Sequence, residues 1–209
     1  EAVAISGRLR KAGRRDMTEV DAVTGSRTGR PGYAEAVSGC PYVTLLRGNV
    51  RHQDGDNAIR VSSGNVLSGR KANPRGYIGF YDNQLTLIPE GDKYEFLGWA
   101  MPRFNKFSVS RNYFSWLCPS RKYDLDTNMN GGHRALVVTG LFERFVPMDI
   151  YPMHLIKAAI AGDIDKMENL GIYEVIPEDL ALCEFVDPSK TDIQQIIRDG
   201  ISLMIKELS

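Results

Sequence analysis

TDIQQIIRDGISLMIKELS, from Thr191 to Ser209, is the clearest structural signal in the chain. Thr191 and Gln194 form a capping-box pattern, and Asp192 stands in the first turn, where the helix dipole favours a negative charge. Apolar residues then recur at helical spacing on one face: Ile193, Ile196, Ile197, Ile201, Met204, Ile205 and Leu208. Burying these side chains would contribute about 10–20 kcal/mol before the entropy cost, so we predict an amphipathic helix packed on a core.

The sequence before this helix also indicates helices. Residues 153–171 are predicted to form two helices that meet near Gly162, with Gly171 as the C-terminal stop. Pro177 is predicted to start a third, short helix, because the first turn of a helix tolerates proline. The tail, residues 146–209, is therefore expected to be a small helical bundle.

Residues 42–101 carry β-strand signals instead of helical ones. Short segments rich in β-branched and aromatic residues, or alternating apolar and polar side chains, lie at 42–46, 58–62, 77–81, 84–88 and 94–101. Asp82 and Asn83, between the third and fourth of them, suit a two-residue hairpin turn. Together with the helical tail, these strands predict an α+β fold.

The length of apolar runs, the charge and the cysteine content limit the classes of protein to which the chain can belong. No run approaches the roughly 20 apolar residues of a membrane-spanning helix. Residues 1–53 hold nine Lys or Arg against five Asp or Glu, and residues 124–209 hold seven against fifteen. The basic run at 8–15 lacks interleaved aromatic residues, so no nucleic-acid partner is expected. The cysteines share no short spacing, which indicates free thiols in a reducing, cytoplasmic compartment.

Motifs for catalysis or metal binding are absent from the sequence. Neither common type of Gly-rich phosphate loop occurs, so flavin or nicotinamide binding is not expected in this chain. The histidines His52, His133 and His154 are isolated from one another, so a zinc site would need long-range assembly. We therefore predict no catalytic residue and no resident metal or cofactor.

MPRFNKFSVSR, residues 101–111, interleaves aromatic and cationic side chains. Such a mixture suits a planar ligand with a polar head, such as a quinone, or the surface of a partner protein. It also fits an extended segment whose phenylalanines lie in the core and whose cations lie in water. The candidate residues for a quinone site or a subunit interface are Trp99, Arg103, Phe104, Lys106, Phe107 and Arg111.

PEDLALCEFVDPSK, residues 177–190, has the spacing of an iron–sulfur ligand segment without its ligands. Cys183 stands four residues before Asp187, and Pro188 follows where a cluster-binding segment carries a Cys-Pro pair. A carboxylate is a poor replacement for a soft thiolate ligand. We interpret Cys183 and Asp187 as a degenerate cluster segment that holds no metal.

Together with GWAMPRFNKFSVSR (98–111) and LFERFVPMDIYP (141–152), this segment resembles the NqrA family. NqrA is one of the subunits of the sodium-translocating NADH:quinone reductase, a bacterial respiratory sodium pump. In that family the last motif usually reads Leu-Cys-x-x-x-Cys-Pro, so Asp187 is a departure from it. The resemblance implies that the chain corresponds to the C-terminal half of NqrA.

The resemblance also implies an architecture. Residues 1–36 would be the end of a truncated Rossmann-like domain, and strands at 3–7 and 20–26 would pair with partners outside the chain. Residues 37–145 would form a soluble-ligand-binding β-grasp module with an extension, and residues 146–209 the helical domain. The loop after residue 62 resembles the loop of that module, in which glycines surround a small apolar pair: Gly64, Val66, Leu67 and Gly69.

For function, the resemblance implies a peripheral subunit on the cytoplasmic face of the bacterial inner membrane, docked on the membrane subunits of the pump. The whole complex passes electrons from NADH to a quinone and exports sodium, with flavins and iron–sulfur centres in other subunits. This chain is expected to bear no cofactor and to support assembly, with quinone as a candidate ligand.

Two other classes of protein stay open. A stand-alone β-grasp module for a small ligand predicts a closed pocket in the β-rich part of the chain. A member of the related Rnf electron-transfer complex would carry ferredoxin cysteines, which this sequence lacks.

Overall fold

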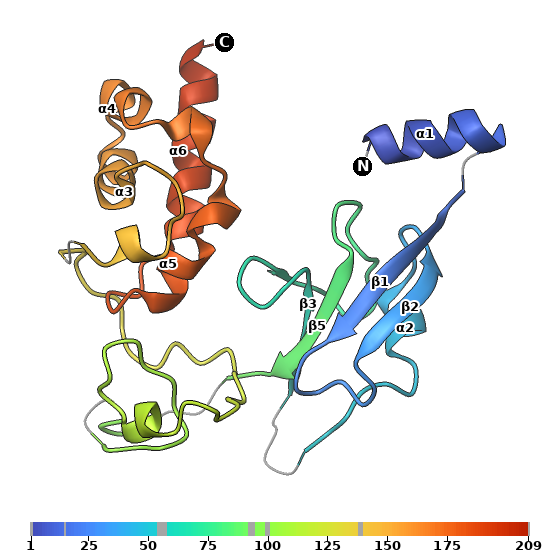
Figure 1. Cartoon of the computed structure of the whole chain (residues 1–209), viewed down its shortest axis with the longest axis horizontal. Helices are drawn as coiled ribbons and strands as arrows, with labels where there is room; N and C mark the ends of the chain where they lie inside the picture. Colours follow the sequence, from blue (N-terminus) through green and yellow to red (C-terminus); the bar gives the residue numbers. More distant parts are fainter. Residues whose placement is uncertain are drawn as a thin grey trace. The chain divides into compact units, whose positions relative to one another are not determined.

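The computed structural model describes residues 2–14, 16–53, 58–91, 95–98, 101–137 and 140–208. The chain divides into two compact units (Figure 1). Unit 1 is Glu1–Glu95 with Lys122–Asn128, and unit 2 is Phe96–Arg121 with Met129–Ser209. Unit 1 contains a mixed β-sheet and unit 2 contains most of the helices, so the predicted α+β class is confirmed.

Unit 1 is built on a five-stranded sheet with the strand order β2-β1-β5-β3-β4. The strands are β1 (Thr18–Thr24), β2 (Gly32–Val37), β3 (Ile59–Ser63), β4 (Arg70–Lys71) and β5 (Gln84–Pro89). β1 pairs antiparallel with β2 and parallel with β5, while β3 pairs antiparallel with both β4 and β5. β5 therefore lies at the centre of the sheet, between β1 and β3 (Figure 1).

The apolar side chains of β5 explain its central place. Leu85 and Leu87 have no exposed surface, and Thr86 between them is also buried. Because side chains alternate along a strand, Leu85 and Leu87 point to one face and Thr86 to the other. Val23 of β1 pairs with Leu85, and Val61 of β3 pairs with Leu87. The three inner strands thus share one apolar face, which forms the core of unit 1.

The first segment of unit 1 departs from the predicted structure. Residues 3–7 belong to a helix, α1 (Ala2–Ala12), so the predicted strand is wrong. Arg10 and Lys11 occupy its last turn, where the helix dipole favours cations, and Gly13 follows with a φ of 68°. The strand predicted at 20–26 is confirmed as β1, but its partners β2 and β5 lie inside the chain rather than outside it.

Residues 42–46 were expected to be a strand and instead form a short helix, α2 (Tyr42–Leu46). Pro41 precedes it with a φ of −63° and supplies the carbonyl that accepts from the N–H of Thr44 at 3.0 Å. Tyr42 and Leu45, three residues apart, both reach the core from one side of the helix. Packing has overridden the β-propensity of the segment.

The hairpin predicted at residues 77–88 is also wrong in its first half. Residues 77–81 form a bridge at Tyr77 and a turn, in which the N–H of Asp82 donates to the carbonyl of Gly79 at 3.0 Å. The carboxylate of Asp82 accepts from the Ser63 hydroxyl at 2.5 Å, which holds this turn against β3. The strands predicted at 58–62 and 84–88 are confirmed as β3 and β5.

Unit 2 gathers its helices around one apolar core. They are α3 (Pro152–Ala161), α4 (Ile164–Asn169), α5 (Ala181–Val186) and α6 (Ile193–Leu208), with short 3-10 turns η1 (Phe114–Leu117), η2 (Phe142–Arg144), η3 (Ile172–Glu174) and η4 (Pro177–Leu180). Gly162 and Gly171 have left-handed backbones, with φ of 65° and 83°, at the ends that the sequence predicted. Pro177 starts η4 as expected, and α5 continues from it.

Helix α6 confirms the predicted amphipathic helix with two corrections. Asp192 caps it, because its carboxylate accepts from the N–H of Gln195 at 3.3 Å, and the predicted pairing of Thr191 with Gln194 is not the cap. The N–H of Gln194 donates instead to the carboxylate of Glu184 on α5 at 2.8 Å. The buried stripe is also narrower than predicted, since Ile205 is 62% exposed.

Some expectations concern segments with little regular structure. Residues 131–137 and 140–141 contain no strand, and the two residues between them are outside the described part. Of the strand predicted at 94–101, the described residues 96–98 form a turn and 101 a bend, and residue 95 has no regular structure. Within the described residues, no helix is long and apolar enough to cross a membrane.

Candidate functional site

The aromatic-cationic segment at residues 101–111 lies in unit 2 and is largely exposed. Phe104 and Phe107 each keep about half of their surface in solvent, so neither is a core residue. The ring of Phe104 lies 5.8 Å from that of Phe114, and the ring of Phe107 stacks on Phe185 of α5 at 5.5 Å. Trp99 is outside the described residues.

The cations of this segment have identifiable neighbours. The ammonium of Lys106 donates to the side chain of Asn130 at 2.6 Å. The guanidinium of Arg111 lies over the ring of Trp116, 5.6 Å from its centroid, in cation–π geometry. Arg103 is partly buried. The structure therefore brings residues of 101–111 together with η1, which the sequence had not assigned to the site.

Cys183 and Asp187 occupy different chemical environments, and both are fully buried. Cys183 lies on α5, with its thiol 3.8 Å from the carbonyl oxygen of Phe142. Burial, together with the negative charges of Glu143 and Asp187, raises the pKa of the Cys183 thiol to about 12. The thiol is therefore protonated at neutral pH in this state of the chain.

The carboxylate of Asp187 organises the turn between α5 and α6. One of its oxygens accepts from the N–H of Ser189 at 3.0 Å, and the other accepts from the N–H of Thr191 at 2.8 Å. These bonds satisfy one buried and one partly buried backbone donor. Asp187 thus has a structural role in this turn. Among the described residues no group of three or more His, Cys, Asp and Glu is placed to hold a metal ion.

Replacing Asp187 by alanine is expected to lower the free energy of unfolding by about 1–3 kcal/mol, because one buried and one partly buried N–H group lose their acceptor. Asp187→Asn keeps one acceptor oxygen and should lose less. Urea unfolding of the whole chain, followed by circular dichroism, measures both changes. Asp199→Ala, at an exposed position on α6, is the control and should change stability by less than about 0.5 kcal/mol. Equal losses in Asp187→Ala and Asp199→Ala would contradict the buried role.

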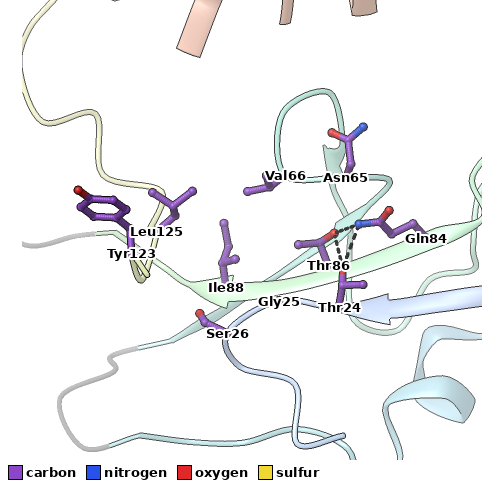
Figure 2. A pocket seen from close by; sticks show the side chains of 10 residues that line it. All are labelled: Thr24, Gly25, Ser26, Asn65, Val66, Gln84, Thr86, Ile88, Tyr123 and Leu125. Atoms are coloured by element: carbon purple, nitrogen blue, oxygen red, sulfur yellow. Dashed lines mark hydrogen bonds between the residues drawn. The ribbon is translucent and has the colours of Figure 1, made fainter. Parts of the chain in front are cut away.

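A partly open pocket of about 260 Å³ lies in unit 1 (Figure 2). Its lining comes from the end of β1, the glycine loop, β5 and residues 123–125, and consists of Thr24, Gly25, Ser26, Asn65, Val66, Gln84, Thr86, Ile88, Tyr123 and Leu125. None of these residues carries a charge. The pocket therefore suits a neutral molecule, although it is not the closed pocket that the small-ligand alternative predicts.

Polar side chains form one wall of this pocket. The amide nitrogen of Gln84 donates to the hydroxyl of Thr24 at 2.9 Å and to that of Thr86 at 3.2 Å (Figure 2). The Thr86 hydroxyl donates in turn to the carbonyl of Gly64 at 2.8 Å, which links β5 to the glycine loop. Gly64 has a φ of 94°, and a Cβ at Gly69 would lie 2.2 Å from the carbonyl oxygen of Asn65. The glycines that the sequence singled out are therefore required by the shape of this loop.

Residues 122–128, which we call the strap, complete the pocket. The guanidinium of Arg27, which is almost fully buried, pairs with the carboxylate of Asp124 at 3.0 Å. Further along, the hydroxyl of Thr127 accepts from the N–H of Gly91 at 2.8 Å. These contacts hold the strap where Tyr123 and Leu125 line the pocket (Figure 2). No local sequence signal indicates the strap, because Arg27 and Asp124 are 97 residues apart.

Comparisons with known proteins agree with the sequence motifs. A family model described as the NQRA C-terminal domain matches residues 20–73. The NqrA subunit of the Na(+)-translocating NADH-quinone reductase of Rhodopirellula baltica is 39% identical over 208 residues, which cover 99% of this chain and 45% of the relative. The protein of the same name from Shewanella denitrificans is 38% identical, with 99% and 46% covered, and that from Pasteurella multocida is 39% identical, with 96% and 44% covered.

These relatives are considerably longer than this chain, which spans a little under half of their length. The similarity nevertheless extends over almost every residue of the chain, including all three motifs that suggested the family. We conclude that the chain is a relative of the NqrA subunits of the Na(+)-translocating NADH-quinone reductases.

Proposed function

We propose that the chain is part of a peripheral subunit of a sodium-translocating NADH:quinone reductase. The observation that carries this proposal is the 39% identity to the NqrA subunit of such an enzyme over 99% of the chain. In this proposal the chain supports assembly on the cytoplasmic face of the membrane, docked on the membrane subunits. Electrons pass through flavins and iron–sulfur centres in the other subunits, and this chain is not itself catalytic.

The surroundings of Cys183 and Asp187 support the proposal that this chain holds no iron–sulfur cluster. Cys183 is fully buried with its thiol 3.8 Å from the carbonyl oxygen of Phe142, and Asp187 uses both carboxylate oxygens to hold the backbone of a turn. Releasing Asp187 to bind a metal would leave one buried and one partly buried N–H group without an acceptor. We therefore propose that this segment has kept its shape as a structural turn.

The proposed architecture has three parts, namely the end of an N-terminal domain at 1–36, a β-grasp module at 37–145 and a helical bundle at 146–209. The glycine loop and the family match over residues 20–73 support the module. β1 and most of β2 lie within residues 1–36 but pair in the same sheet as β3 to β5, so in this proposal the first two parts share one sheet.

The aromatic-cationic segment is the proposed contact with quinone or with a neighbouring subunit. Its residues are Trp99, Arg103, Phe104, Lys106, Phe107 and Arg111. The half-exposed rings of Phe104 and Phe107 offer apolar faces, and the cationic Lys106 stands between them in the sequence. A quinone head group needs both kinds of contact.

A chimaeric complex tests the proposed function. This chain replaces the matching part of the NqrA subunit from Shewanella denitrificans, and the complex is purified from membranes through another subunit. We expect the chimaeric NqrA to co-purify and sodium-dependent NADH:quinone reductase activity to be retained. A folded, expressed chimaera that never co-purifies would contradict the proposal.

The same complex tests the proposed contact. Phe104→Ala combined with Phe107→Ala should raise the KM for quinone or lower the yield of assembled complex by at least about tenfold, as loss of an interface hot spot does. Phe80→Ala in unit 1 is the matched control, because Phe80 is similarly exposed and outside the segment. Equal behaviour of the double variant and the control would exclude the contact.

A further inference from the structure

The 3-10 turn η1 presents its apolar side chains to solvent and buries its polar one. Ser115 is 3% exposed, and its hydroxyl donates to the carbonyl of Lys106 at 2.6 Å. Phe114, Trp116 and Leu117 are 45%, 48% and 55% exposed. A 3-10 helix has three residues per turn, so Phe114 and Leu117 lie above one another. The inward hydrogen bond of Ser115 therefore keeps the apolar side chains of the turn directed outward.

Neighbouring residues extend this surface. Phe104 is 52% exposed and its ring lies against that of Phe114, so the two rings and η1 form one surface. We call Phe104, Phe114, Trp116 and Leu117 the apolar patch. Arg111 lies over the Trp116 ring and is itself exposed, which places a cation at the edge of the patch.

Charge is distributed unevenly within unit 2. Residues 96–121 hold four Lys or Arg and no Asp or Glu, which gives a net charge of +4. Residues 129–209 hold seven Lys or Arg against thirteen Asp or Glu, which gives −6. A negatively charged surface would therefore attract the segment that carries the apolar patch and repel the rest of the unit.

We propose that the apolar patch and its cations bind the surface of a lipid bilayer that contains anionic lipids. Tryptophan and arginine favour the headgroup level, and the phenylalanine and leucine side chains of one turn reach the boundary of the acyl chains. Residues 96–121 contain cations and no carboxylate. This single sign of charge matches the uniform negative charge of lipid phosphates. A protein partner would more often present charges of both signs at the rim of an interface.

This inference goes beyond the proposed function and rests on unit 2 alone. It adds a direct contact with the bilayer to the contacts with membrane subunits. The exposed Arg121 lies four residues after Leu117, so a further cation of unit 2 stands close to the patch in sequence. Binding is expected to weaken with salt, because the lipid charge is screened.

Vesicle sedimentation with the whole chain tests the inference. At low salt we expect binding to phosphatidylcholine vesicles that contain phosphatidylglycerol, and little binding to phosphatidylcholine alone. The double variant Trp116→Ser with Leu117→Ser should weaken binding by at least about tenfold, since it removes two inserted apolar side chains. Arg111→Gln should weaken it about fivefold and reduce its salt dependence.

The matched control is Phe80→Ser with Tyr81→Ser, which removes two exposed aromatic residues from unit 1. Circular dichroism verifies that each variant is folded, and the control should bind vesicles as the unchanged chain does.

Failure of the folded chain to bind phosphatidylglycerol vesicles overturns the inference and leaves the patch as a protein interface. Full binding by the Trp116→Ser, Leu117→Ser variant overturns it equally. Vesicle binding and assembly of the chimaeric complex are independent readouts, so the two proposals fail separately.

Discussion

Replacing Gly25 by alanine is expected to unfold the sheet of unit 1, with a loss of at least about 4 kcal/mol in the free energy of unfolding. Gly25 follows β1 with a φ of 105°, which L-residues with a side chain rarely adopt. A Cβ at this position would lie 2.0 Å from the carbonyl oxygen of Leu87 and 2.7 Å from its backbone nitrogen. Leu87 belongs to the central strand, so its backbone cannot move aside without breaking the pairing with β3.

Urea unfolding of the whole chain measures this effect through the loss of β-structure in circular dichroism. Gly32→Ala is the matched control, because Gly32 lies on the edge strand β2 and a Cβ there meets no atom within 4 Å. The control should change stability by less than about 1 kcal/mol. A Gly25→Ala chain as stable as the Gly32→Ala chain would show that the turn after β1 does not approach β5 this closely.

Replacing Ile197 by alanine is expected to lower the free energy of unfolding of unit 2 by about 2–5 kcal/mol. Ile197 lies on α6 with no exposed surface, within the apolar core of the unit. Truncation removes three carbon atoms from a close-packed interior and leaves a cavity, because the surrounding helices relax only in part.

Ile205→Ala provides an internal comparison for this effect. It makes the same chemical change on the same helix, so both variants gain the same helix propensity from alanine. The two sites differ in burial, because Ile205 is 62% exposed. Thermal unfolding should place Ile205→Ala within about 0.5 kcal/mol of the unchanged chain. Equal losses in the two variants would mean that Ile205 is buried too, as the full apolar stripe in the sequence predicts.

The sequence predicted unit 2 better than unit 1 because the signals in unit 2 are local. Gly162, Gly171 and Pro177 mark helix ends through their own backbone preferences, and these ends are found where they were expected. In unit 1 the deciding interactions are distant. The β-branched content of residues 42–46 predicted a strand, yet burial of Tyr42 and Leu45 against the sheet makes the segment helical.

The candidate site also combines features that the local sequence predicts with features that depend on distant residues. The composition of residues 101–111 identified the aromatic-cationic segment, and the glycine loop was identified by its spacing. The outward direction of η1 depends on a hydrogen bond from Ser115 to a carbonyl nine residues earlier, which no sequence pattern reveals. The strap depends on the pair of Arg27 and Asp124, which the fold alone brings together. Orientation and long-range pairing were therefore the parts that required the structure.

The position of β5 has a consequence for how unit 1 folds during synthesis. β5 is the last strand of the sheet to be made and the one at its centre, so β1 and β3 wait for their shared partner. The β1–β2 hairpin can form as soon as it leaves the ribosome, whereas the parallel pairing of β1 with β5 must close a loop of about sixty residues, which is slow. Until then both hairpin edges are open to other chains, so the nascent chain is most prone to aggregation just before residues 84–89 emerge.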